Sequence, residues 1–163
     1  MSAHEYRGLV EGICALTGIA DAASMLEMAN FEVNGIPFTL MDGSEIEDGT
    51  VLYFCDFGEV PGERRADILQ ELLEANLAMY AKESPSFSIN FYTKHVVLTG
   101  RIAIRNTTPA KLLEELAWRA HQATQWRQTC LLSSQAPLIQ DPLQKKTVNT
   151  VKRKSPSAQF RAD

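Results

Sequence analysis

The stretch that most constrains the fold is residues 61–80, PGERRADILQELLEANLAMY. Its apolar residues recur at steps of three and four, which at about 3.6 residues per turn places them on one side of a helix. Pro61 and Gly62 mark the start, and the acidic Glu63 and Asp67 suit the partial positive charge of the first turns. The stripe is wide enough to contact more than one surface. It consists of Ile68, Leu69, Leu72, Leu73, Leu77 and Tyr80.

One polar residue, Asn76, lies within or beside this stripe, eight residues after Ile68. An amide that is buried without a partner costs about 1–3 kcal/mol. We therefore expect the Asn76 side chain to be hydrogen-bonded. The pattern leaves the partner open, and a second copy of the chain across a two-fold axis is one candidate.

Strand patterns precede this helix. Asn34-Gly35 separates two short alternating segments, and it is the strongest short turn signal because both residues tolerate positive φ. A tight hairpin is expected there. After the polar residues 42–50, residues 51–57 (VLYFCDF) are apolar on both faces, which is typical of a central strand or of one covered by another subunit. The alternating residues of the hairpin are Phe31, Val33, Ile36, Phe38 and Leu40.

Two more strands and a last helix follow. Residues 87–91 alternate strictly, a turn comes at residues 93–94, and residues 96–104 read as the next strand. The segment Asn106-Thr-Thr-Pro109 is a helix-start signal, because threonine can cap the free amides and proline fits the first helical position. We expect this helix to run to about residue 132. Its apolar side consists of Leu112, Leu113, Leu116, Ala120 and Ala123, with bulk added by Trp118 and Trp126.

The chain begins with another amphipathic helix pattern, residues 6–16, with Gly18 as its stop. Gly8 and Gly12 weaken this helix relative to alanine, so it depends on packing. Residues 19–30 fit either a short helix or a loop. The resulting order is α-β-β-β-α-β-β-α, which predicts an α+β fold with a small antiparallel sheet and three helices.

Composition and charge bound the organisation. A chain of 163 residues with 45% apolar and 22% charged residues fits one soluble domain, which we place at residues 1–135. The net charge of −4 hides an asymmetry, because residues 141–163 carry six basic and two acidic side chains and the rest of the chain carries −8. An acidic body repels nucleic acid and membrane phosphates and favours cationic partners. Residues 136–163 are basic and aperiodic, so we expect a disordered tail.

The residue pattern indicates neither an enzyme nor a bound cofactor or metal. The histidines are scattered, and the three cysteines are odd in number and widely separated, so they read as small apolar residues. Residues 58–62 lack the Gly-Lys-Ser/Thr ending of a phosphate loop. No apolar run reaches the roughly 18 residues of a membrane span, and no export signal begins the chain, so we expect a cytoplasmic protein. The residues considered are His4, His95, His121, Cys14, Cys55 and Cys130.

Four segments carry a family resemblance. Residues 72–77, LLEANL, resemble the LLxANL signature in the middle helix of the CesT/Tir-type chaperones, the class I chaperones of bacterial type III secretion. Residues 57–61 (FGEVP) are similar to that family's strand-to-helix passage, residues 38–43 (FTLMDG) to its early hairpin, and residues 123–127 (ATQWR) to the end of its final helix. The resemblance covers roughly residues 4–132. The long 19–30 connection and the basic tail depart from the pattern.

The resemblance implies a cytosolic homodimer that holds the amino-terminal chaperone-binding segment of a secreted effector in extended form, without nucleotide, and passes it to the secretion apparatus. Neither nucleic acid nor membrane insertion is implied, and the secretion ATPase is a further candidate partner. By match of motif, the dimer residues are Leu72, Leu73, Asn76, Leu77 and Tyr80. For effector contact we select Leu9, Ile13, Phe31, Val33, Phe38 and Tyr53.

Two alternatives stay open at the level of sequence. The first is a regulatory or adaptor domain of similar α+β build that recognises a folded protein. The second is an enzyme that uses Cys14 or Cys55 with a histidine as its base. An extended client separates the chaperone from the adaptor, and thiol reactivity tests the enzyme.

Overall fold

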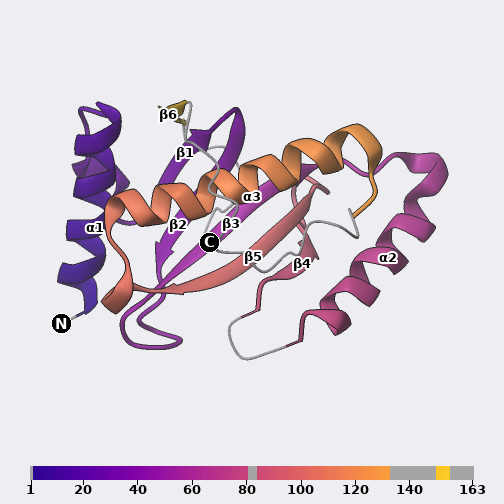
Figure 1. Cartoon of the computed structure of the whole chain (residues 1–163), viewed down its shortest axis with the longest axis horizontal. Helices are drawn as coiled ribbons and strands as arrows, with labels where there is room; N and C mark the ends of the chain where they lie inside the picture. The colour runs from indigo at the N-terminus through magenta and orange to yellow at the C-terminus, as the bar shows by residue number, and fades with distance from the viewer. Residues whose placement is uncertain (1, 81–83, 133–149, 155–163) are drawn as a thin grey trace.

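The computed structural model describes residues 2–80, 84–132 and 150–154, in which the chain forms three α-helices and a six-stranded antiparallel sheet of order β4-β5-β3-β2-β1-β6 (Figure 1). The predicted α+β class and element order are confirmed, with one strand added at the end. The homodimer stays a prediction. The helices are α1 (Ser2–Thr17), α2 (Arg65–Ala78) and α3 (Pro109–Thr129). The strands are β1 (Ala29–Val33), β2 (Ile36–Asp42), β3 (Thr50–Gly58), β4 (Ser86–Ile89), β5 (Val96–Ala103) and β6 (Val151–Arg153).

The β1–β2 hairpin forms where the sequence predicts it. Asn34 and Gly35 have φ values of 52° and 79°, the left-handed pair that the twist of a two-residue hairpin requires. Phe31 lies opposite Phe38, so their rings share one face of the sheet. β3 pairs with β2 on one side and β5 on the other, which confirms that the strand at residues 51–57 is central.

Helices α1 and α3 pack together on one face of the sheet. Successive strand residues point to opposite faces, so alternate side chains of β1, β2, β3 and β5 meet the helices and form the core. The Tyr6 hydroxyl of α1 donates a hydrogen bond to the Leu40 carbonyl of β2 at 3.0 Å. Burial raises the pKa of Tyr6 well above its usual value, so the hydroxyl stays a neutral donor at that contact.

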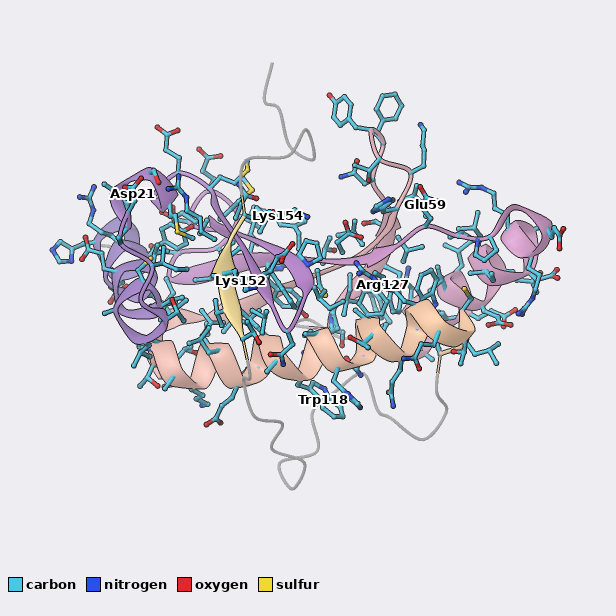
Figure 2. All side chains as sticks on the ribbon, turned by 90° about the horizontal axis from the view of Figure 1, so that it is seen from above. Asp21, Glu59, Trp118, Arg127, Lys152 and Lys154 are labelled. Atoms are coloured by element: carbon cyan, nitrogen blue, oxygen red, sulfur yellow. The ribbon has the colours of Figure 1, made fainter. Side chains whose placement is uncertain are left out.

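The start of α3 confirms the capping signal. The Thr108 hydroxyl accepts a hydrogen bond from the Lys111 amide at 3.2 Å, and Pro109 occupies the first helical turn. The helix ends at Thr129, where Cys130 takes a left-handed φ of 53°. Its two tryptophans differ: Trp126 packs edge-on against Phe57 in the core, whereas Trp118 points away from the sheet (Figure 2).

Arg127 joins the end of α3 to the end of β3. Its Nε donates to the Phe57 carbonyl at 3.0 Å and its Nη2 donates to the Asp56 carbonyl at 2.9 Å. Gly58 follows with φ of 104°, and a Cβ there would lie 3.3 Å from Arg127 Nε. The strand-to-helix passage at residues 57–61 therefore depends on a glycine that lets the guanidinium approach the backbone.

The structure shows the conformation of two segments for which the sequence has no clear periodicity. Residues 19–30 contain a short 3-10 helix, Ala23–Met25, with Met25 buried, and then enter β1 at Ala29. The expected disorder of the tail is wrong for residues 150–154, because Val151–Arg153 pairs with β1. The boundary at residue 135 and the rest of the tail lie outside the described residues.

Replacing each of the two glycines of α1 by alanine should change the stability of the protein in opposite directions. A Cβ on Gly8 meets no atom within 4 Å, whereas a Cβ on Gly12 would overlap the ring of Pro109 at the start of α3. We expect Gly8→Ala to raise the free energy of unfolding by about 0.5–1 kcal/mol through helix propensity. Gly12→Ala should lower it by about 1–3 kcal/mol because α1 and α3 must separate. Urea unfolding measures both, and a shift of both variants in the same direction would contradict this packing.

Candidate functional site

Helix α2 lies beside the sheet beyond β4, apart from the layer that α1 and α3 form (Figure 1). A 3-10 turn, Gly62–Arg64, leads into it, close to the start predicted at residue 62. Ile68 and Leu72 are its two most deeply buried side chains, at 1% and 4% exposure. Most of the helix surface is therefore open to solvent or to a partner.

Asn76 fixes α2 to the outer strand of the sheet. Its Nδ2 donates to the Phe87 carbonyl at 3.0 Å, and its Oδ1 accepts from the Phe87 amide at 2.6 Å. An unpaired strand edge is a template for another chain. The Asn76 amide presents one donor and one acceptor to β4, as the peptide of a neighbouring strand would. The expected hydrogen bond is thus confirmed, but both bonds lie within the chain rather than across a two-fold axis.

An apolar stripe covers the outer side of α2. Leu73 and Leu77 lie one turn apart on α2 and are 68% and 79% exposed, and Tyr80, just beyond the end of the helix, is 88% exposed. The stripe adjoins a cavity of about 240 Å³ between α2 and β4 whose lining includes Leu73 and Phe87. Large apolar side chains gathered in this way mark an interaction surface.

The five predicted dimer residues separate into two groups. Leu72 is buried and Asn76 is bonded to β4, so these two hold α2 within the protomer. Leu73, Leu77 and Tyr80 are exposed and can reach a second molecule. Their role in a dimer stays a prediction.

The six side chains selected for effector contact are all core residues. Each is 4% exposed or less, because β1, β2 and β3 turn these positions toward α1 and α3 and α1 contributes the other two. They are not presented to a partner, so the prediction of direct contact is corrected. Alternation predicts an apolar strand face but not whether a helix covers it. The residues are Leu9, Ile13, Phe31, Val33, Phe38 and Tyr53.

The opposite face of the sheet carries apolar residues that the sequence-based selection missed. Met41 pairs with Leu52, and Phe54 lies between Thr39 and Thr99 in the register. These strand positions alternate with those that point to the helices. Met41, Leu52 and Phe54 are each partly exposed. The available signal was the run at residues 51–57, which is apolar on both faces.

One buried carboxylate is paired on this side of the molecule. Asp56 is 5% exposed, and both of its oxygens lie 3.0 Å from His95 Nδ1. Arg127 Nη2 lies 3.7 Å from Asp56 Oδ1, so the site joins β3, the turn before β5 and α3. The geometry suits an ion pair that fixes these elements when His95 is protonated.

The cysteines do not resemble activated nucleophiles. Burial raises the pKa of the Cys55 thiol well above its usual value, and it also raises the pKa of Cys14. A catalytic cysteine needs a lowered pKa, since the thiolate is the reactive form. Among the described residues, no group of three or more His, Cys, Asp or Glu is placed to hold a metal ion. None of the helices in the described part of the chain is long and apolar enough to span a membrane.

The chain matches one family of known proteins. The model of the Tir chaperone protein (CesT) family matches residues 27–127, from just before β1 nearly to the end of α3. No curated protein matches the chain. Among solved structures, a complex of ExoT with SpcS from Pseudomonas aeruginosa is similar, with a TM-score of 0.46 and 12% identity over 76% of this chain and 95% of that one. The family match spans more than half of the chain and includes the whole of α2.

The Asn76 contact predicts a stability loss that a matched variant lacks. Asn76→Leu leaves the Phe87 amide and carbonyl without their partner, so we expect the free energy of unfolding to fall by about 1–3 kcal/mol. Gln70→Leu makes the same chemical change at an exposed position of α2 and should stay within about 0.5 kcal/mol of wild type. Chemical denaturation measures both. Equal losses in the two variants would show that Asn76 has no special role.

Proposed function

This chain belongs to the Tir chaperone protein (CesT) family, the class I chaperones of type III secretion, and we propose that it binds the amino-terminal chaperone-binding segment of a secreted effector in extended form. The observation that carries the proposal is the family match over residues 27–127. Binding keeps the segment from folding into its own core, so the effector stays competent for export. The chaperone acts in the cytoplasm and without nucleotide.

The surface of the molecule supports this function. An extended segment carries unsatisfied backbone groups and apolar side chains, which a sheet edge and apolar surface can accept. The body of the chain, without residues 141–163, carries a net charge of −8 and so favours a cationic client. After binding, the complex is handed to the secretion apparatus, where its ATPase is a further partner in the proposal.

A second copy of the chain is the proposed occupant of the α2 stripe. Leu73 and Leu77 lie one turn apart on α2, and Tyr80 follows the end of the helix. A two-fold axis across this stripe would bury each of these side chains against the α2 region of the second copy. Their high exposure in one protomer leaves this contact available. The resulting dimer would place two α2 helices at its centre and two sheets outside.

The exposed stripe makes the dimer testable without unfolding the protomer. Leu77→Asp should shift the mass measured by light scattering from twice 18.1 kDa to 18.1 kDa, because a charge would be desolvated in the interface. Ile46→Asp is the matched control, since Ile46 is 63% exposed in the loop between β2 and β3. It should leave the dimer intact. If the Leu77→Asp protein keeps the wild-type mass, α2 is not part of the dimer interface.

Capture of a client tests the function itself. The tagged full-length chain, expressed in the cells that produce it, should co-purify with a secreted protein whose amino-terminal segment resists protease only in the complex. Deletion of that segment should abolish co-purification, because the chaperone holds it directly. Capture of a compact protein that binds equally well without its amino-terminal segment would favour the adaptor alternative instead.

A further inference from the structure

The outer edge of β1 is occupied by the chain's own carboxy-terminal strand, β6. The Asn34 amide donates to the Thr150 carbonyl at 2.7 Å, and the Lys154 amide donates to the Asn30 carbonyl at 3.0 Å. Bonded pairs alternate along an antiparallel ladder. Glu32 and Lys152, which lie opposite each other between these two contacts, therefore form the bonded pair in the middle.

β6 is attached to the β1 edge less firmly than α2 is attached to the β4 edge. It is three residues long and last in the strand order, and its Lys152, labelled in Figure 2, is exposed, as is its Arg153. The β4 edge is closed by Asn76, whose helix is anchored by the buried Leu72. Of the two edges, the one at β1 is therefore the easier to vacate.

The side chains around β6 define what this edge accepts. Val151 lies opposite Val33, whereas the next positions are basic and face acids. Arg153 Nη1 lies 3.1 Å from Asp21 Oδ2, and Lys154 Nζ lies 3.9 Å from Glu32 Oε1. These pairs are partly exposed, so they contribute little stability and act mainly in selection. The edge fits an extended segment in which an aliphatic residue precedes basic ones.

We propose that the outer edge of β1 is the docking site for a basic extended segment of the client, and that β6 is an internal occupant which the client displaces. The inference rests on the proposed function, because it gives the extended client its place on the sheet. On displacement, each backbone hydrogen bond that β6 makes to β1 is replaced by one from the client strand. In the free protein, β6 also keeps the edge from pairing with other chains.

A peptide tests the site without any client. The probe is a fluorescein-labelled peptide with the sequence of residues 148–156, and its Kd is measured by anisotropy against full-length proteins. Lys152→Pro removes the central backbone donor of β6 and should bind the peptide about tenfold more tightly than wild type, if β6 is docked about nine-tenths of the time. Lys154→Pro, which removes the donor to Asn30, serves as a second variant and should act in the same direction.

Two controls separate backbone pairing from charge. Lys152→Thr keeps the backbone donor and should stay within about threefold of wild type. The same peptide with glutamate at its three basic positions should bind the Lys152→Pro protein at least about tenfold more weakly, because it faces Asp21 and Glu32. Equal peptide affinity in wild type and both proline variants, or equal affinity for both peptides, would overturn the inference. Circular dichroism verifies that the proline variants keep the fold.

The captured client complex distinguishes this inference from the proposed function. With a client bound to the full-length chain, the labelled peptide should no longer bind, because the client holds the edge. A client complex that binds the peptide as tightly as the free Lys152→Pro protein would overturn the inference and leave the chaperone function intact. Failure to capture any client would instead count against the function, and the inference would fall with it.

Discussion

The structure depends on how the backbone groups of β4 and β1 are satisfied at the two sides of its sheet. At β4 the side chain of Asn76 supplies both a donor and an acceptor to Phe87, and at β1 the ladder continues into β6. One edge is closed by a residue fixed on a helix, and the other by a short, exposed strand. The proposed binding of an extended client needs such an asymmetry, because an edge that is open at all times would pair with any chain, whereas a permanently closed edge would pair with none.

Helix α2 has an inward side that packs on the sheet and an outward side that is exposed. Its inward side, with Leu72 and Asn76, closes the β4 edge, while Leu73, Leu77 and Tyr80 face outward. Residues of one short motif thus divide between holding the protomer together and forming the exposed surface at which we propose that a second copy binds. From the sequence alone, the motif was interpreted as a single interface. A wide apolar stripe at helical spacing does not show which surface each of its residues contacts.

Local signals in the sequence predicted most of the fold. Asn34-Gly35 gave the hairpin and Thr108-Pro109 the start of α3, because turn and cap chemistry acts over a few residues. The site was predicted less well, since its features depend on distant contacts. Phe31 and Tyr53 were selected as surface because alternation cannot show that α1 and α3 cover them. β6 was missed because three residues carry no period, and its partner β1 lies more than a hundred residues earlier.

Amide hydrogen exchange of the free protein tests the asymmetry of the two edges most directly. The Phe87 amide, bonded to Asn76, should exchange only with global unfolding, whereas the Lys154 amide, bonded to Asn30, should exchange by local opening at least about 100-fold faster. Lys154 protected as strongly as Phe87 would contradict this asymmetry, because β6 would then be a permanent part of the sheet and the β1 edge would be closed to clients.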